Sequence, residues 1–417
     1  MATYSKVWAN RRLRRLFVAM TLSLCGSTAY VVALVALVVE RGGSLDAIGW
    51  LTVARYLPAV ALGAPLGALA DRCGRRASLL VSDVGCFAAQ CALVIAVLAG
   101  APLAVVVVLV VVSSSLAVVY SPAVAAFLPT LASSEELAAA NACNEMVNSA
   151  TAVVGPAIAA GLLVVAGPAA VLAFNAATFA VSAVLVARLP HDALAASDAL
   201  AASDAPRPRR GVLRSTVALL REAGGGLAVA GVSVIGSFTL GADLVLLPAW
   251  SLRQIHAGPS GFAWLLVGLG AGSILAAPLV ERASRMHALP VIAAGAMVVF
   301  LVPTALLAAV HDLAAGIGLE VVGGGATLVG DALVVTAIQR LAPRDAQGQL
   351  FGLFFSVCIG ATAAGSAVAA PLVGALGLRH ALVVLGAGPA LLTAALAGVL
   401  FAGLGAAQRR PRSAEIR

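Results

Sequence analysis

Residues 103–126 read LAVVVVLVVVSSSLAVVYSPAVAA, a stretch without a single charged side chain. A helix needs about 20 mostly apolar residues to cross a bilayer. The rest of the chain has the same character, because 61% of its 417 residues are hydrophobic and only 11% are charged. Soluble domains carry about 25% charged residues. This composition excludes a soluble globule and a disordered chain, and it predicts a polytopic membrane protein.

Twelve stretches of the chain are long and apolar enough to span a membrane. The first six are predicted at 16–39, 47–70, 77–99, 103–126, 144–166 and 168–188. The second six are predicted at 226–250, 259–280, 288–310, 313–338, 349–374 and 380–403. A β-barrel is excluded because the apolar runs are continuous rather than alternating. We therefore expect an all-α polytopic membrane protein with two six-helix bundles.

One long polar segment separates the two groups of spans. It opens with the repeat DALAAS-DALAAS from Asp192, which is typical of a linker without chemistry of its own. Its residues 212–221 have apolar side chains near helical spacing, which predicts a short helix lying on anionic lipid. The predicted organisation is an N-terminal segment, a first bundle, a linker, a second bundle and a tail, at 1–15, 16–188, 189–225, 226–403 and 404–417.

The basic residues predict the orientation. With the N-terminus in the cytoplasm, 22 of the 26 Lys and Arg residues lie in cytoplasmic segments and only Arg41, Arg253 and Arg379 lie outside. Membrane proteins carry their excess Lys and Arg on the cytoplasmic side. We therefore expect a multi-pass protein of the plasma (inner) membrane, with both termini cytoplasmic and no cleaved signal peptide.

The two halves share a short sequence pattern. The loop after the second span reads Asp71-Arg-Cys-Gly-Arg75, and the loop after the eighth reads Glu281-Arg-Ala-Ser-Arg285. An acid, the adjacent arginine and a second arginine three residues later recur, and a leucine precedes each acid by two positions. Such an echo in equivalent loops indicates the parallel repeat of a two-bundle transporter.

Several motifs resemble those of the major facilitator superfamily. The stretch Gly67-Ala-Leu-Ala-Asp71-Arg72-Cys-Gly74-Arg75-Arg76 resembles its signature loop between helices two and three. In span five, Gly155-Pro156-Ala-Ile-Ala-Ala-Gly161 resembles its Gly-Pro antiporter motif, with alanine in place of one usual glycine. The resemblance implies twelve transmembrane helices in two pseudo-symmetric bundles and transport by alternating access.

Shorter stretches resemble one branch of the superfamily, that of enterobactin exporters and macrolide-efflux proteins. They are Ser121-Pro-Ala, Leu128-Pro, Leu137-Ala-Ala-Ala-Asn, Ala173-Phe-Asn-Ala, Leu246-Leu-Pro and Phe351-Gly-Leu-Phe. Two features depart from the family. Gln347 and Gln349 flank Gly348, where that branch often has arginines, and span four lacks the arginine of many efflux pumps. Proton coupling through that arginine is therefore not carried over.

The signature loop also has a physical interpretation. Asp71 is expected near the cytoplasmic N-terminus of helix eleven, whose positive end attracts a carboxylate. We expect this contact to hold the halves together in the outward-facing state, and the arginines to bind lipid headgroups. The positive-inside rule alone is sufficient for Arg75 and Arg76, but it does not explain Asp71. Gly155-Pro156 predicts a bend with close helix packing; control of leak through that bend is implied by resemblance alone.

Ionisable side chains at membrane depth are costly, and each is a functional candidate. The candidates for proton coupling are Asp331 and Glu320, ranked first, and Asp243, ranked second. Glu320 and Asp331 are eleven residues apart, which brings them to within about 20° of one helix face. Arg55 and Asp243 are both expected near the outer face, where they could pair across the halves as a gate.

Four further polar residues have two interpretations each. The resemblance implies that Asp83 belongs to the structural network around the signature loop, and this interpretation is preferred to a transport role. Glu145 lies near a helix end and is a structural or coupling residue. Asn148 and Asn175 either hydrogen-bond between helices or contact substrate, and packing is the preferred interpretation.

Other classes of function lack the residues they need. The only lysine is Lys6, so no phosphate-binding loop ends in lysine, and neither GxSxG nor HExxH occurs. The six cysteines show no CxxC spacing and are interpreted as packing residues. We expect no enzyme activity, no cofactor, no metal site and no nucleic-acid partner.

The sequence therefore predicts a secondary active transporter that acts as a monomer in the lipid bilayer. Its expected activity is proton-coupled efflux of a small apolar or amphipathic compound, such as a drug, an antibiotic, or a secondary metabolite or siderophore. The alternatives are uptake or facilitated transport of a small metabolite, and a non-transporting receptor or scaffold. Coupling to protons is implied by the resemblance, and the buried acids are consistent with it.

Overall fold

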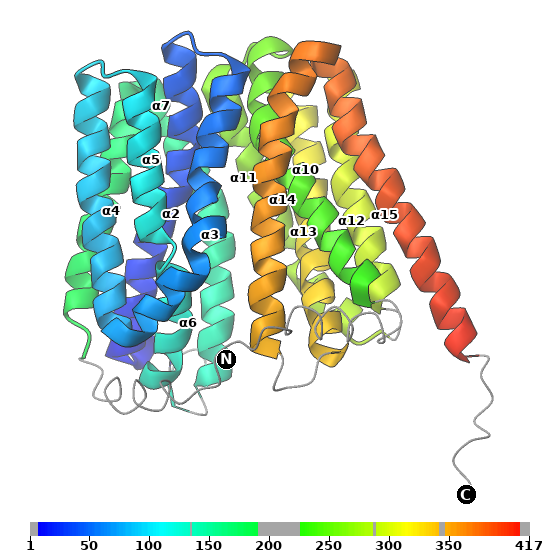
Figure 1. Cartoon of the computed structure of the whole chain (residues 1–417), viewed down its shortest axis with the longest axis horizontal. Helices are drawn as coiled ribbons and strands as arrows, with labels where there is room; N and C mark the ends of the chain where they lie inside the picture. Colours follow the sequence, from blue (N-terminus) through cyan, green and yellow to red (C-terminus); the bar gives the residue numbers. More distant parts are fainter. Residues whose placement is uncertain (1–6, 134–135, 191–225, 287–288, 342–346, 409–417) are drawn as a thin grey trace, which may run out of the picture. The chain divides into compact units, whose positions relative to one another are not determined.

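A computed structural model describes residues 7–133, 136–190, 226–286, 289–341 and 347–408. Side chains are described there except at 64–73, 138, 226, 341, 347–349, 399–400 and 402–408. Every regular element in this part of the chain is a helix (Figure 1). The helix predicted on the linker, at 212–221, lies outside the described residues.

The helices of the first half cover all six predicted spans, although α2 begins five residues and α7 seven residues before the predicted positions. They are α2 (Arg11–Glu40), α3 (Leu45–Cys73), α4 (Arg75–Leu98), α5 (Leu103–Ala117), α6 (Tyr120–Leu131) and α7 (Leu137–Ala187). Helices α5 and α6 form one span that is interrupted at Val118 and Val119. The interruption fits Pro122, which has no N–H to donate to the carbonyl group one turn before it.

The second half follows the same plan. Its helices are α10 (Gly226–Arg253), α11 (Gly258–Ser284), α12 (Leu289–Leu306), α13 (Leu313–Leu341), α14 (Gln347–Leu376) and α15 (Leu378–Gln408). A single 3-10 turn, η1 (Leu307–Ala309), extends α12.

Eleven stretches of the described residues are helical, long and apolar enough to cross a membrane. One of these stretches, on α7, is long enough to cross the membrane twice. This helix has 51 residues and is broken at Gly167, where φ is 72° and ψ is −176°, directly before Pro168. A helix of that length would extend about 77 Å, more than twice the thickness of the hydrocarbon core. The described residues therefore supply twelve crossings, and the predicted all-α membrane fold is confirmed.

The chain forms two compact units. The first unit comprises Met1–Pro206 and the segment Leu247–Gly270, and the second comprises Arg207–Leu246 and Ala271–Arg417. Leu247–Gly270 comes from the second half of the sequence but belongs to the first unit. It contains the end of α10 and the beginning of α11. The predicted bundles, at 16–188 and 226–403, differ from these units because the prediction assigned all of α10 and α11 to the second bundle.

In the first unit, α2 packs closely against both parts of α7. A Cβ atom on Gly155 would overlap the hydroxyl oxygen of Thr28, and one on Gly26 would overlap that of Thr178. The Thr28 hydroxyl also donates a hydrogen bond to the carbonyl oxygen of Thr151, at 2.9 Å, one turn before Gly155. Close contacts of this kind hold helices together in lipid, where the hydrophobic effect between helices is absent.

Arginines join the helix ends of the first unit. The Arg15 guanidinium donates to the carbonyl oxygen of Arg188 at 3.0 Å, which joins the beginning of α2 to the end of α7. Arg41, beyond the other end of α2, donates to the carbonyl oxygens of Val97 and Ala101. The beginning of α2 therefore lies with the end of α7, and the end of α2 lies with the end of α4.

The second unit also uses glycines at its helix crossings. A Cβ atom on Gly241 of α10 would overlap the carbonyl oxygen of Thr362 on α14, and one on Gly272 of α11 would overlap that of Val321 on α13. A Cβ atom on Gly386 of α15 would overlap the backbone of α12 at Ala305. Both units are therefore built on crossings that admit no side chain.

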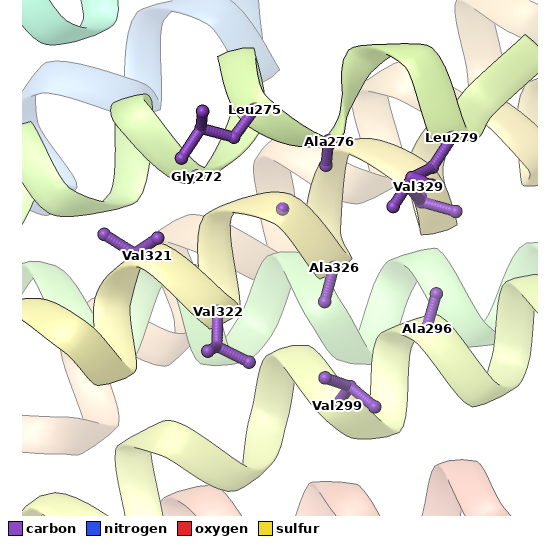
Figure 2. Close-up of a pocket in the computed structure, with 11 residues that line it drawn as sticks. Gly272, Leu275, Ala276, Leu279, Ala296, Val299, Val321, Val322, Ala326 and Val329 are labelled. Atoms are coloured by element: carbon purple, nitrogen blue, oxygen red, sulfur yellow. The ribbon is translucent and has the colours of Figure 1, made fainter.

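A shallow apolar groove with a volume of about 410 Å³ lies among α11, α12 and α13 (Figure 2). Its lining side chains are aliphatic, and several are well exposed: Leu275 is 72% exposed and Val322 51%. In a chain that spans a membrane, such an exposed apolar groove suits contact with lipid. The groove offers no group that could hold a proton or orient a polar ligand.

Candidate functional site

Two buried carboxylates of the second unit influence each other electrostatically. Asp243 on α10 is 5% exposed, and Glu320 on α13 is 4% exposed. The two side chains are close enough to interact electrostatically. They come from helices that are far apart in the sequence, so the fold creates this pair.

A hydroxyl group from a third helix completes the pair. Thr304 of α12 lies 3.1 Å from both carboxylate oxygens of Asp243 and donates to this carboxylate. No side chain of the described residues donates a hydrogen bond to Glu320. Thr304 could not be found from the sequence, because a threonine in an apolar span usually bonds to its own helix.

The surroundings of the pair contain no described positive charge. The described Arg and His residues of the second unit all lie at or near helix ends: Arg282, Arg285, His311, Arg340, Arg379 and His380. None of them contacts Asp243 or Glu320 in the described part of the unit. The two acids are therefore buried together with one hydroxyl donor.

The third acid of this unit has a different environment. Asp331 lies further along α13 than Glu320 and is exposed. It accepts a hydrogen bond from Ser233 of α10 at 3.1 Å. Glu320 and Asp331 therefore both face α10, but only Glu320 joins the buried pair.

Arg55 was predicted to pair with Asp243 as an outer gate. Arg55 is half-buried on α3 of the first unit, and its guanidinium carbon lies 5.4 Å from the centroid of the Tyr56 ring. It also interacts electrostatically with Tyr30 of α2. Asp243 belongs to the second unit, so the pair stays a prediction.

Asp83 is fully buried on α4 of the first unit. It accepts a hydrogen bond of 2.7 Å from the Ser182 hydroxyl of α7, while its second oxygen, Oδ1, has no partner. One turn further along, Cys86 bonds to the carbonyl oxygen of Ser113. Asp83 thus lies among hydroxyl and thiol groups between helices, and both its structural and its transport interpretations stay open.

The signature loop forms a turn of one residue. Helix α3 ends at Cys73 and α4 begins at Arg75, with Gly74 between them at a φ of 86°. Only glycine adopts this conformation without steric strain. Arg76 donates from Nε to the carbonyl oxygen of Val186 at 3.3 Å and also bonds to that of Ala187. A cation here satisfies the free carbonyl groups at the end of α7.

The contact predicted between Asp71 and the N-terminus of helix eleven involves side chains outside the described ones. Asp71, Arg72 and Gly67 lie where side chains are not described, and Arg75 is half-buried. The echo in the second half differs, since Glu281 pairs with Arg285 of its own helix at 2.6 Å, with both side chains largely exposed. The contact predicted for Asp71 stays a prediction.

The remaining candidates lie on α7. Gly155 and Pro156 are buried, and Gly155 packs against α2. Glu145 is exposed and accepts a hydrogen bond from the Asn144 amide at 3.1 Å. Asn175 is 1% exposed and lies against Gly26, and neither atom of its amide group has a hydrogen-bond partner in the described residues, so both of its interpretations stay predictions. In the described part of the chain, no three His, Cys, Asp or Glu side chains form a group that could hold a metal ion.

Apolar helices of membrane length, with buried acids and close glycine crossings, define a multi-pass membrane protein. The profile of the Major Facilitator Superfamily matches residues 16–365, most of the sequence. The chain belongs to the Major Facilitator Superfamily, and it is a transporter rather than an enzyme.

One relative and two solved structures illustrate the similarity. A Sinorhizobium fredii (strain NBRC 101917 / NGR234) protein, the uncharacterized MFS-type transporter y4rN, is 29% identical over 385 residues, which cover 86% of this chain and 87% of the relative. A crystal structure of a mutant of the nucleoside transporter NupG has a TM-score of 0.72 at 14% identity and covers 94% of this chain and 100% of its own.

A POT family transporter in complex with 5-aminolevulinic acid has a TM-score of 0.68 at 13% identity. The match covers 94% of this chain and 97% of that transporter. At such low identity these structures share the fold with this chain, and the ligands belong to those proteins.

Proposed function

We propose that this chain is a proton-coupled exporter of small apolar or amphipathic compounds, such as drugs, antibiotics or secondary metabolites including siderophores. It works by alternating access as a monomer in the plasma (inner) membrane, with both termini cytoplasmic. The observation that carries the proposal is the buried pair of Asp243 and Glu320, which the fold assembles from α10 and α13.

The pair has the chemistry that proton coupling needs. Two negative charges that interact within a membrane repel each other, and a bound proton removes the repulsion. Thr304 can hydrogen-bond Asp243, but it cannot neutralise a charge. When the access of the pair to water changes between two conformations, its affinity for the proton changes with it, and proton binding then biases the conformational equilibrium.

Burial supports a different ranking of the acids as candidates for proton coupling. Asp243 and Glu320 come first, because each is buried and each can influence the charge of the other. Asp331 comes next, since it is exposed and bonded to Ser233. Arg55 is kept as the gate candidate, and Asp83 and Glu145 as secondary candidates for coupling.

Export, rather than uptake, is supported by the motif at Gly155-Pro156 and by the short stretches that resemble the enterobactin-exporter and macrolide-efflux branch. The packing of Gly155 against Thr28 makes the motif a rigid crossing of α2 and α7. The second candidate is uptake of a small metabolite, which the similarity in fold to a nucleoside transporter favours.

Drug accumulation in cells that lack their own pumps tests the proposal. Cells that produce the protein should accumulate less of an exported compound, and a proton uncoupler should raise accumulation to the level of control cells. The variants Asp243→Asn and Glu320→Gln should lose the uncoupler-sensitive difference. Accumulation above that of control cells would indicate uptake. If both variants and Asp331→Asn still export against a gradient, the coupling site lies elsewhere.

A further inference from the structure

A small pocket in the first unit carries three asparagines on one face of α7. Its volume is about 150 Å³, and it lies among α2, α6 and α7. The asparagines are Asn141, Asn144 and Asn148, at spacings of three and four residues. Residues three, four and seven apart share one face of a helix. Sequence reasoning considered only Asn148, although this spacing was the signal that could have identified the whole set.

The pocket has an apolar floor and a polar edge. Met20 of α2 is buried, as are Val124 and Leu128 of α6. At the edge, Asn141 and Asn148 are exposed, and their amide groups make no hydrogen bond within the described part of the chain. Asn144 donates one N–H to the Glu145 carboxylate at 3.1 Å. Its amide oxygen and its other N–H are available to a ligand.

The depth of these amides matters. By the predicted span 144–166, Asn148 lies four residues, about 6 Å, inside the span, while Asn144 begins it and Asn141 precedes it. Amide donors and acceptors at membrane depth need partners, because lipid chains offer none. Water or a ligand must therefore satisfy the amide of Asn148.

No side chain that lines the pocket carries a charge. Two carboxylates adjoin it through its lining residues. Glu145 is bonded to Asn144, and Asp83 of α4 interacts electrostatically with Tyr120 of α6, whose buried hydroxyl also lies near Ser182. The surface that a ligand meets is therefore neutral, with both donors and acceptors.

We infer that this pocket is a substrate subsite that binds a neutral hydrogen-bonding group, such as a hydroxyl, a carbonyl or an amide, at one end of an amphipathic compound. The volume fits this role, since sites for whole drug-sized ligands occupy about 300–1,000 Å³. The apolar floor takes the adjoining hydrocarbon part, and the asparagines fix its orientation. The inference rests on the proposed function only in treating the ligand as transported, and it names the ligand's polar group.

Binding to the purified full chain in detergent tests the inference without any proton gradient. The first probe is chloramphenicol, which is neutral and carries two hydroxyl groups and one amide. The second is tetraphenylphosphonium, a cation without hydrogen-bonding groups. We expect saturable binding of chloramphenicol and weaker binding of tetraphenylphosphonium, measured by equilibrium dialysis of the labelled compounds.

The variants then identify the site. The double variant Asn144→Ala/Asn148→Ala should weaken chloramphenicol binding about tenfold, which is about 1.4 kcal/mol for the two lost hydrogen bonds together. Ser149→Ala is the matched control, because Ser149 neighbours Asn148 on α7 but does not line the pocket. Asn148→Asp should strengthen binding of the cation. All variants must keep the thermal stability of the wild type, and Asn148→Gln replaces any that does not.

Three results would overturn the inference. They are no saturable binding of chloramphenicol to the wild-type protein, unchanged binding in the double variant, and tighter binding of tetraphenylphosphonium than of chloramphenicol by the wild type. None of these measurements depends on Asp243 or Glu320. The subsite can therefore fail while proton coupling stands, and the reverse also holds.

Discussion

The first and second units carry different polar chemistry inside similar helical frames. The pocket of the first unit is edged by the amides of Asn141, Asn144 and Asn148, which keep their charge state at any ordinary pH. The second unit buries two acids, Asp243 and Glu320, and a carboxylate can bind and release a proton; the first unit buries one, Asp83, which accepts a hydrogen bond from Ser182. The difference suggests a division of work, with recognition of the substrate in the first unit and proton binding in the second.

The frames themselves do not explain this difference. Each unit is held by helix crossings at glycines, such as Gly155 in the first and Gly241 in the second. The repeated loop after the second and eighth spans predicts that the two halves form a parallel repeat. The two units differ in the few polar side chains that their spans carry. Substitution of these side chains therefore tests the comparison.

The largest effect is expected from the acids. Glu320→Gln and Asp243→Asn should each reduce uphill export to the passive level, because the proton-binding pair is lost. Both variants should still equilibrate substrate downhill and bind it normally. Transport into proteoliposomes, with and without an imposed pH gradient, measures both properties.

The asparagine variants provide the contrast to the acid variants. Asn144→Ala/Asn148→Ala should need more substrate for half-maximal export, yet reach a normal gradient when substrate is saturating. If the acid variants lose binding, or the asparagine variants lose the gradient at saturation, the division between the units is wrong.

A stability effect should follow from Gly155→Ala. Its new methyl group would overlap Thr28 and the carbonyl oxygen of Cys25, so the crossing of α2 and α7 must open. Overpacking of this kind costs about 1–3 kcal/mol. The midpoint of thermal unfolding in detergent should fall by several degrees.

Gly161 is the matched control in the same motif. A Cβ atom there would meet nothing within 4 Å, so Gly161→Ala should leave the unfolding midpoint unchanged or raise it slightly. Equal effects of the two substitutions would show that the crossing does not depend on the missing side chain.

A smaller effect is expected from the two related loops. Asp71→Asn should slow transport several-fold with near-normal expression, because it weakens a contact made in one conformation rather than a core. Glu281→Gln should be milder, since Glu281 is exposed and pairs within its own helix. Initial rates of export, normalised to the amount of protein in the membrane, measure both. A wild-type rate for Asp71→Asn would refute the predicted contact.

The smallest signal is expected from the linker. A single cysteine at Ala196, in a background without other cysteines, should resist an impermeant thiol reagent in intact cells. The reagent should label it after the membrane is permeabilised, because the predicted orientation places 189–225 in the cytoplasm. Labelling of intact cells would reverse the orientation.

Most of the fold could be predicted because the bilayer imposes a length on each helix. The ends of α2, α4 and α13 lie within a few residues of their predicted positions. The merged helix α7 also fits, since Gly167 stands where one span was predicted to end and the next to begin. The interruption between α5 and α6 was missed, because Pro122 was interpreted only as part of a motif.

The sites were harder to predict, because burial at membrane depth identifies acids but not their partners. Asp243 and Glu320 are 77 residues apart in the sequence, and nothing local shows that they interact. Hydroxyl partners such as Thr304 and Ser182 are ordinary residues of apolar spans. Periodicity could have identified the asparagine face of α7, since its spacing is local.

The most direct test measures protons when substrate binds. Chloramphenicol is added to purified protein in weakly buffered detergent solution, and released protons are followed with a pH-sensitive dye. Wild-type protein should release protons in proportion to the compound bound, and Asn148→Ala should release the same number for each molecule bound. Glu320→Gln and Asp243→Asn should bind the compound and release far fewer. Proton release of wild-type size from both acid variants would contradict the assignment of protons to the second unit.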